Sequence, residues 1–598
     1  MTDPLPGFEQ PAAPPRVDSV FSGRVVRVQP DITGVQRQFD YVVPAAWEDD
    51  GRAAKIAVGS LVRVDFHGRR TAGWITDVDV TPDPSLELRA LAKWSSVGPP
   101  QELIALGDWA AWRWAGRLPH FLRAASPQRM VEEVAPRVEP PIADANPAMD
   151  AVFSPGVTHV RTTPNDSGLA VAIEAAVRGS ALILVPTLHQ RTEFSRALRN
   201  QGFDVAGYPE QWARSASGVL TVGTRLGAWA PVPEPASIVV IDEHDRAYKE
   251  ERTPAWNARD VAIERARRGG VPCVLTSPSP SLEGLETADR RLSPERSVER
   301  ESWPVVDVVD LRTADRPGLL TDAIVSLVRD STTVACILNR KGRSRMLACG
   351  NCDALATCDA CGVAVHQPDD TTLECVSCGT TRPVVCSACG ATKFKLIRPG
   401  IGRVAEDLRA LAKRDVIEVT AETDAADMSG EGLFIGTEAL LRRLPNADAV
   451  VFLDFDQELA VPRSRAAEDA FSMLALAARR VGPRSQGGRV VIQTRKPDDI
   501  VVQAALHGDP KRVAESQRDV RRVFGQPPYG AWAVVSGAGS ATFIERLRAV
   551  DESASLRLAQ LGDRWRIAAE SHTELLEIIN AVDRPAERLR IDVDPIDL

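Results

Sequence analysis

The chain has 598 residues, of which 44% are hydrophobic and 26% charged, so most of it can bury a core, and its length predicts three or more domains. With 72 Lys and Arg against 81 Asp and Glu, the formal charge is −9; this balance does not indicate nucleic-acid binding, so any such contact must come from local patches. Apolar runs such as 181–185 and 238–241 are too short to cross a bilayer, which predicts a cytoplasmic protein with no membrane partner.

The first part of the chain predicts a tail, a β-domain and a helical module. Residues 1–18 are rich in proline and are expected to be disordered. Short β-type runs at 25–28, 39–43, 61–64 and 73–75 predict a small β-barrel or sandwich over 19–97. Leu103, Leu106, Trp109 and Trp112 recur at helical spacing, so 98–136 should be helical; the tryptophans fit helix packing better than base stacking. A Pro/Ala-rich linker follows at 137–150.

The middle of the chain predicts two α/β lobes. Buried-type β runs alternate with helical segments over 151–300, and a second such set spans 301–495. This alternation is typical of parallel sheets covered by helices. A further α+β segment, 496–598, ends in the strand-like run 589–594. The predicted fold is therefore a multidomain α/β protein.

Eight of the ten cysteines form four Cys-x-x-Cys pairs within the second lobe, in a module predicted at 349–397. The pairs are Cys349/Cys352, Cys358/Cys361, Cys375/Cys378 and Cys386/Cys389. Two such pairs complete a four-thiolate zinc site, so four pairs predict two structural Zn²⁺ ions without an open catalytic position. A disulfide cluster is the alternative, but the only other cysteines are Cys273 and Cys336, and no secretory segment is evident. Spacing alone leaves open whether consecutive or nested pairs share an ion.

Two basic runs could contact DNA. One covers 340–345 and includes Arg340, Lys341 and Arg343, and the other covers 511–522. For any one run, a solvated surface is as good an interpretation as a phosphate contact.

This order of domains resembles the PriA family of bacterial replication-restart proteins, which are superfamily-2 DNA helicases. The resemblance covers nearly the whole chain, and its most specific element is the cysteine spacing after residues 338–342. Further matches lie at 39–41, 222–225, 243–245, 435–437, 527–529 and 592–595. The resemblance implies helicase-like lobes, a winged-helix-like character for 98–136, and DNA, single-strand-binding protein, primosome components and the replicative helicase as partners.

The resemblance also assigns roles to individual residues. It implies that the outer cysteine pairs (Cys349, Cys352, Cys386, Cys389) hold one zinc and the inner pairs (Cys358, Cys361, Cys375, Cys378) the other. It further implies a pocket for the 3′ end of a nascent strand, in which Phe39 and Tyr41 border the terminal base, Asp40 bonds to it and Arg89 assists. The alternative is that Phe39 and Tyr41, two apart on a strand, face the core.

Several departures from the family pattern concern ATP. No Gly-Lys dipeptide occurs in the chain, and the stretch expected to hold the Walker A loop, 156–164, ends in Pro164, which has no N–H to donate. Ile241 stands where the family has a magnesium-binding Asp, with Asp242 next to it, and the arginine-finger segment at 478–484 lacks most of its glycines. These departures therefore argue against ATP and Mg²⁺ as cofactors.

These departures predict a degenerate helicase. An arginine finger alone accounts for about 10³–10⁵ in rate, and phosphoryl transfer depends almost entirely on positioning and electrostatics. We expect a protein that recognises stalled forks and initiates primosome assembly to reload the replicative helicase. Its two motor lobes are expected to be inactive and to serve as a scaffold. The alternatives are an ATP-dependent 3′-to-5′ helicase with an unconventional phosphate loop, and a zinc-stabilised adaptor with no role on DNA.

Overall fold

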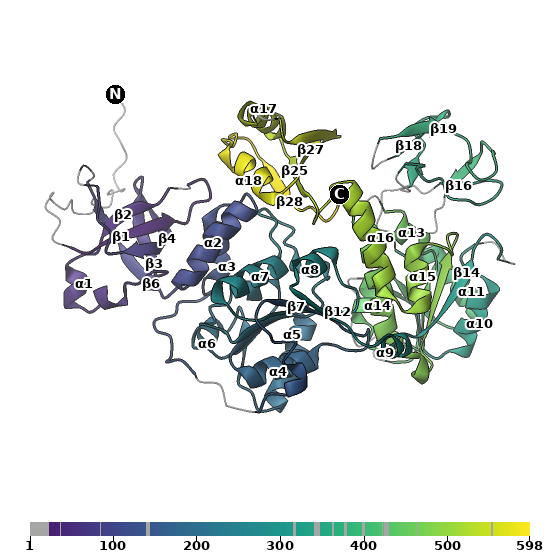
Figure 1. Cartoon of the computed structure of the whole chain (residues 1–598), viewed down its shortest axis with the longest axis horizontal. Helices are drawn as coiled ribbons and strands as arrows, with labels where there is room; N and C mark the ends of the chain where they lie inside the picture. The colour runs from purple at the N-terminus through teal and green to yellow at the C-terminus, as the bar shows by residue number, and fades with distance from the viewer. Residues whose placement is uncertain are drawn as a thin grey trace, which may run out of the picture.

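The computed structural model describes residues 23–598 except 36, 84, 86, 139–143, 315–317, 340–346, 361–363, 376–378, 397–400, 421–422, 424–427, 429, 462 and 552–553. In Figure 1 the N-terminal β-domain, the first lobe and the second lobe follow one another along the long axis, with the C-terminal domain above the first lobe and the cysteine module beside the second. The multidomain α/β fold predicted from the sequence is confirmed. The described part contains no helix long and apolar enough to span a membrane.

The β-domain is a six-stranded sheet in the order β5-β2-β1-β4-β3-β6. Its inward residues alternate along the strands, as in Val26, Val28, Val62 and Val64, all at most 1% exposed. Its elements are β1 (Val25–Pro30), β2 (Phe39–Val42), α1 (Ala46–Asp49), β3 (Leu61–Phe66), β4 (Arg69–Val78), β5 (Arg89–Ala90) and β6 (Lys93–Ser96).

Residues 98–136 contain α2 (Gln101–Arg113) and α3 (Leu118–Ala125), and no strand among those the structure describes. The two helices pack on each other and on lobe 1, with Leu103, Leu106 and Trp114 in a shared core. Trp109 and Trp114 meet edge to face at 5.3 Å, which supports helix packing as the role of Trp109. Trp112, the other tryptophan named in the prediction, is instead exposed.

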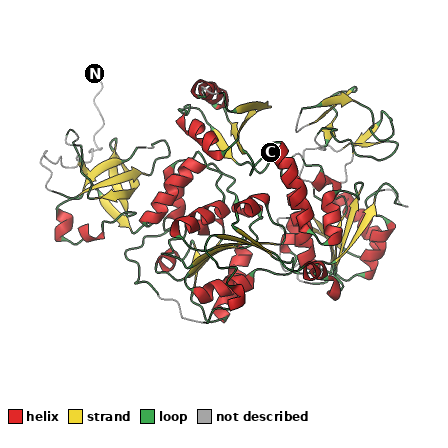
Figure 2. Ribbon diagram, in the orientation of Figure 1, coloured by secondary structure: helices red, strands yellow, loops and turns green. Residues whose placement is uncertain are grey.

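Lobe 1 is a seven-stranded parallel sheet in the order β13-β7-β12-β11-β8-β10-β9. Its central strands are buried along their whole length and mostly apolar because helices cover both faces (Figure 2). Its strands are β7 (Val157–Arg161), β8 (Ala181–Leu184), β9 (Val205–Tyr208), β10 (Leu220–Gly223), β11 (Ser237–Val240), β12 (Cys273–Ser277) and β13 (Arg290–Leu292). Its helices are α4 (Leu169–Arg178), α5 (Leu188–Asn200), α6 (Trp212–Ala216), α7 (Ala258–Gly269) and α8 (Leu282–Thr287), and α9 (Arg296–Ser302) leads out of it.

Lobe 2 is a six-stranded parallel sheet in the order β14-β24-β23-β15-β22-β21. Its strands are β14 (Val305–Asp310), β15 (Val334–Ile337), β21 (Val416–Val419), β22 (Leu433–Gly436), β23 (Ala449–Phe452) and β24 (Arg489–Thr494). Its helices are α10 (Asp322–Asp330), α11 (Ile401–Ala412), α12 (Glu438–Arg443), α13 (Asp456–Leu459) and α14 (Ala466–Val481).

The predicted boundary at residue 496 is placed too early. Helices α15 (Ile500–His507) and α16 (Pro510–Val523) pack on α14, and Val501, Val502 and Val513 belong to the core of lobe 2. Helix α15 also packs on β14, and α16 packs on α15, so the last domain begins after α16.

The cysteine module projects from lobe 2 between β15 and α11. It contains small antiparallel ribbons with little core of their own, formed by β16 (Leu347–Cys349), β17 (Val365–His366), β18 (Thr372–Cys375), β19 (Thr381–Pro383) and β20 (Phe394–Leu396).

The C-terminal domain is an antiparallel sheet in the order β26-β27-β25-β28 with two helices on one face. Its elements are β25 (Ala531–Ser536), α17 (Ser540–Val550), β26 (Arg557–Leu561), β27 (Arg564–Ala569), α18 (His572–Ala581) and β28 (Arg590–Val593). Its buried residues, including Ala533 and Ile567, are continuous with those of α2 and lobe 1.

Candidate functional site

The predicted 3′-end residues lie at one end of the β-domain, on two faces of β2. Tyr41 points inward and is 4% exposed, and its hydroxyl donates to the carbonyl of Asp65 at 3.2 Å. Burial raises the pKa of Tyr41 to about 12, so its hydroxyl stays protonated. Phe39, on the same face, is partly buried and packs edge to face on Phe66 at 5.2 Å. Tyr41 is therefore part of the core, while Phe39 lies at its margin.

Asp40 lies on the opposite face of β2 and pairs with Arg27 of β1 through contacts of 2.8 and 3.2 Å. Arg89 is the register partner of Tyr41 and contacts Asp65 at 2.7 Å. The structure thus groups Arg89 with Tyr41 and Asp65, and Asp40 with Arg27. Arg27 and Asp65 carried no motif that would have identified them in the sequence.

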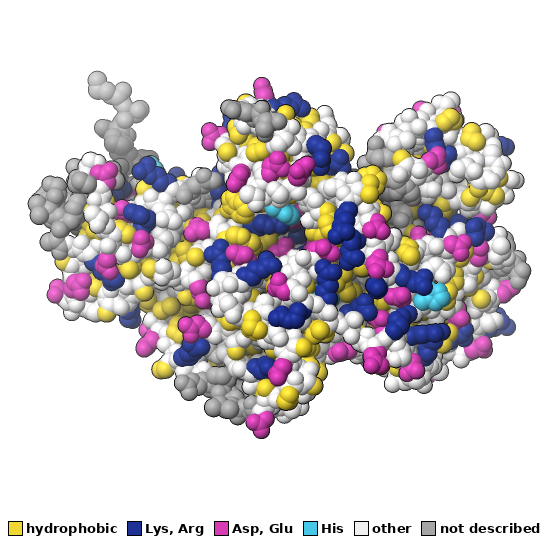
Figure 3. Space-filling model, in the orientation of Figure 1, with side chains coloured by type: hydrophobic (Ala, Val, Ile, Leu, Met, Phe, Trp, Pro, Cys, Tyr) yellow, Lys and Arg dark blue, Asp and Glu magenta, His cyan; other side chains and the backbone are white. Residues whose placement is uncertain are grey.

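The two basic runs differ in what the structure shows. Arg340, Lys341 and Arg343 lie outside the described residues. The run 511–522 forms α16, over which Lys and Arg side chains make a stripe in Figure 3. Several of these cations already have partners: Lys511 contacts Glu515 at 3.4 Å, and Arg518 contacts Glu286 at 3.4 Å.

Four cysteines of the module converge on one point. The sulfur atoms of Cys349, Cys352, Cys386 and Cys389 all lie within 4.8 Å of one another. The Cys349–Cys389 and Cys352–Cys386 sulfur separations are 3.5 and 3.7 Å. Four sulfurs about 2.3 Å from a tetrahedral zinc would lie about 3.8 Å apart, so both the spacing and the all-thiolate donor set fit such an ion. The outer pairs are thus positioned together to bind a metal.

The inner pairs are described only in part. Cys358 and Cys375 are buried, whereas Cys361 and Cys378 lie outside the described residues. The turn after Cys375 nevertheless repeats the turn of the outer site: Cys375 N–H donates to Thr380 O, and Gly379 N–H, at positive φ, donates to Cys375 O. Cys386 makes the same pair of bonds with Ala391 and Gly390.

The segment that would form the phosphate-binding loop lies between β7 and α4. The chain reaches α4 through Gly168 in the left-handed region, where a Cβ would lie 2.9 Å from the Ile241 side chain. Ile241 is fully buried, so an apolar group fills the space beside the loop. Arg161, the cation nearest to the expected lysine position, is held by Glu299 of α9 at 2.8 Å.

Glu243, which follows Asp242 after β11, is buried and surrounded by partners. It accepts from Arg259 at 3.1 Å and from the hydroxyl of Ser281 at 2.7 Å, and lies 3.3 Å from His159. Burial opposes the charge, yet these neighbours hold the pKa of Glu243 well below its usual range. The carboxylate is therefore a structural anion within lobe 1.

Asp242 is bound from the other lobe. Arg479 of α14 contacts both carboxylate oxygens, at 2.8 and 2.9 Å, and its Nε donates to the carbonyl of Pro164 at 2.8 Å. One side chain thus connects the end of β11, the loop after β7 and lobe 2. The sequence singles out each of these three segments separately, and no local pattern predicts that they meet.

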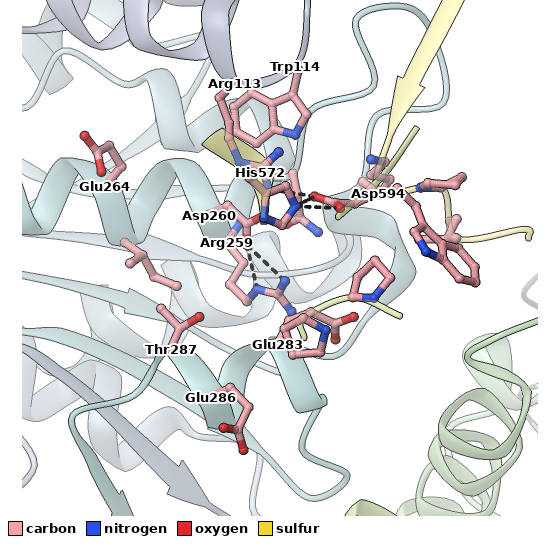
Figure 4. Close-up of a pocket in the computed structure, with 18 of the residues that line it drawn as sticks. Arg113, Trp114, Arg259, Asp260, Glu264, Glu283, Glu286, Thr287, His572 and Asp594 are labelled. Atoms are coloured by element: carbon pink, nitrogen blue, oxygen red, sulfur yellow. Dashed lines mark hydrogen bonds and ion pairs between the residues drawn. The ribbon is translucent and has the colours of Figure 1, made fainter. Parts of the chain in front are cut away.

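A cavity of about 380 Å³ lies where α2, lobe 1, lobe 2 and the C-terminal domain meet, away from Asp242. Figure 4 shows His572 and Arg113 converging on Asp594, with His572 Nε2 2.8 Å and Arg113 2.6 Å from its carboxylate. Burial opposes ionisation of Asp594, but these two partners lower its pKa. They join α2 to the last strand of the chain.

Comparisons with known proteins agree with the sequence resemblance. Residues 25–127 match the PriA family described as 3′DNA-binding domain (3′BD), a match that crosses the predicted boundary at residue 97. The chain is 28% identical to the probable replication restart protein PriA of Mycobacterium tuberculosis, over 90% of this chain and 88% of that protein. It is 26% identical to the replication restart protein PriA of Bacillus subtilis, over 65% of this chain and 52% of that protein.

The predicted relationship to PriA is therefore confirmed. The chain matches about half the length of the Bacillus relative and most of the mycobacterial one. Solved structures of S. cerevisiae Dbp5 align with 62% of the chain at 11% identity and a TM-score of 0.31, too low to support a shared arrangement of the lobes.

Proposed function

We propose that this chain, a relative of the PriA replication restart proteins, recognises abandoned replication forks and initiates primosome assembly without hydrolysing ATP. The proposal is supported by the 3′DNA-binding match over residues 25–127 and by the relatives' names. Recognition would use the end of the β-domain that carries Phe39, Asp40 and Arg89, with Arg340, Lys341 and Arg343 as further candidate contacts.

The observation that carries the proposal is that the region expected to bind phosphate lacks the groups that normally do so. Pro164, Gly168 and the buried Ile241 occupy the place of a phosphate loop, and no Gly-Lys dipeptide is present in the chain. Backbone N–H groups and a lysine normally hold the triphosphate there. Without them, positioning and charge stabilisation, which make up most of phosphoryl-transfer catalysis, are lost.

The cysteine module would be held by two structural Zn²⁺ ions. The outer four sulfurs fit one ion, and the repeated turn after Cys375 supports a second site formed by Cys358, Cys361, Cys375 and Cys378. Structural zinc contributes about 10–16 kcal/mol per site in small peptides, enough to fold ribbons with so small a core. With no open coordination position, the metal would stabilise and perform no chemistry.

The test measures ATPase turnover and fork affinity on one preparation. We expect tight binding to forks with a free 3′ end, weaker binding when that end is blocked, and no ATP hydrolysis with either DNA. Hydrolysis stimulated by forks would instead support an active 3′-to-5′ helicase. Affinity for branched DNA that did not fall with salt would support an adaptor without a DNA role, because phosphate contacts release counterions.

The partners and compartment belong to the same proposal. Assembly of a primosome implies contacts with single-strand-binding protein and with the machinery that reloads the replicative helicase. It also implies a cytoplasmic protein. Pull-down of these components by fork-bound protein, compared with protein bound to plain duplex, tests this part separately.

A further inference from the structure

The facing surfaces of the two lobes carry complementary charges that bind each other directly. Lobe 2 contributes arginines and lobe 1 carboxylates: Arg479–Asp242 at 2.8 Å, Arg442–Asp245 at 2.7 Å, and Arg465 and Arg521 with Glu283, each at 3.0 Å. A longer pair, Arg246–Asp469 at 3.8 Å, has the reverse polarity. The contacts extend from the ends of the lobe 1 strands to α8.

Arg479 is central to this arrangement because it binds two parts of lobe 1 at once. Its two terminal nitrogens form a bidentate pair with the Asp242 carboxylate, and its Nε donates to the carbonyl of Pro164. The side chains of Arg479 and Asp242 are 19% and 7% exposed, so losing either partner would leave a largely buried charge. Burial disfavours the charge on Arg479, but Asp242 raises its pKa.

We propose that Arg479 replaces a nucleotide as the link between the lobes, and that the lobes keep one closed arrangement whether or not nucleotide is present. This inference rests on the proposed function, because a protein that cycles through ATP must open and close the same interface. The arginine-finger segment would then have changed from a catalytic to a positioning role. Fork recognition would depend on a fixed spacing between the β-domain and lobe 2.

Hydrogen–deuterium exchange on the full-length, zinc-loaded chain tests the proposal without any substitution. We expect amide exchange over residues 165–168 and α14 to be the same with and without excess MgATP. Protection of these segments by MgATP without hydrolysis would overturn the inference and leave the proposed function standing. Fork-stimulated hydrolysis would overturn the proposed function itself.

Substitutions provide the second test. Arg479→Ala should accelerate exchange in both segments roughly tenfold or more, because Asp242 loses its buried partner. Arg484→Ala is the matched control, since among the described residues the Arg484 side chain donates to the carbonyl of Trp303 within lobe 2, at 3.4 Å, and its loss should change neither segment. The double variant R479A/D242A should exchange no faster than the faster single variant; additive effects, or no effect of R479A, would refute the link.

Discussion

The four-cysteine cluster and the ends of the lobe 1 strands both gather side chains able to bind a ligand, but they leave those side chains in different states. The sulfurs of Cys349, Cys352, Cys386 and Cys389 face one another at the spacing of a metal site. The carboxylates of Asp242 and Glu243 are instead each occupied by an arginine of the protein. Only the first region offers its donors to something outside the chain.

Under the proposed function, the ends of the lobe 1 strands are a ligand site that has been lost while its fold persists. A buried carboxylate is costly unless it is paired, so the carboxylates of such a site need cations from the protein itself. Arg479 is the cation paired with Asp242, and Arg259 is the cation paired with Glu243. In the described part of the cysteine module the four converging sulfurs have no cation of the protein among them, and the ribbons have only a small core.

Removing the metal should have the largest effect. Cys386→Ser should lower the zinc content by about one ion per chain and unfold the module, since a structural site contributes on the order of 10 kcal/mol. Zinc analysis together with limited proteolysis within 347–396 would measure this. Cys336→Ala, outside the cluster, should leave the zinc content unchanged. An initial content near one or zero would contradict the two-site proposal.

Glu243→Ala should be the most damaging of the changes at the lobe 1 strand ends. It removes a buried partner of Arg259, and breaking a buried pair costs about 3–5 kcal/mol. Urea unfolding followed by tryptophan fluorescence, to which Trp229 and Trp256 in the lobe 1 core contribute, would measure this loss of stability. Glu264→Ala breaks only the i,i+4 pair with Arg268 and should cost about 0.5 kcal/mol. Equal losses would show that Glu243 is not a structural anion.

Asp454, at the end of β23 in lobe 2, predicts a dependence on pH. Burial and then Asp456 raise its pKa to about 6, and Arg495 at 3.4 Å compensates only in part. The folded state therefore binds this proton more tightly than the unfolded state, whose pKa is about 3.9. Stability from this group should fall as pH rises from about 4 to 6, by up to about 3 kcal/mol.

Asp454→Asn should remove this pH-dependent loss of folding stability, so the variant should be more stable than the parent protein at neutral pH. Denaturation at about pH 4 and pH 7 would measure it. Asp448→Asn should do the opposite, because the hydroxyl of Thr332 leads the contacts that lower the pKa of Asp448, so its contribution is present at neutral pH and lost on acidification. The same sign for both variants would contradict the assignment.

Asp40 combines features of the two regions compared above, because it is paired with Arg27 but lies near the surface of its domain. Asp40→Ala should weaken binding to forks with a free 3′ end by about tenfold and change binding to plain duplex less. Asp79→Ala, which breaks the more exposed pair with Arg24 on the same sheet, is the matched control. Equal losses on both DNAs after Asp40→Ala would refute a role in capturing the end.

Local patterns were enough to predict much of the fold. The runs 181–185 and 238–241 predicted buried parallel strands, because a strand covered on both faces must be apolar throughout. The cysteine spacing predicted metal sites because two Cys-x-x-Cys turns supply one tetrahedron. It could not decide which turns meet, since Cys352 and Cys386 are 34 residues apart and come together only through the fold of the module.

The rest required long-range geometry. Arg479 and Asp242 are 237 residues apart, and nothing local to either predicts their pairing. The sequence placed α15 and α16 in the last domain, because nothing local to them shows which sheet they cover, whereas Val501, Val502 and Val513 belong to the core of lobe 2. Alternation along β2 placed Phe39 and Tyr41 on one face, while the burial of Tyr41 depends on how β3 closes against it.

The core shared by α2, lobe 1 and the C-terminal domain bears on the order in which the protein can mature. Ala533, Ile567 and Ile591 complete an apolar surface that begins with Leu103, and Lys249 donates to the carbonyl of Val593 at 2.6 Å. During synthesis, lobe 1 therefore emerges from the ribosome with an apolar face that stays exposed to solvent until residues 531–593 have been made. A chaperone that binds exposed apolar surfaces would be needed longest at this face, and a chain truncated before residue 531 should aggregate.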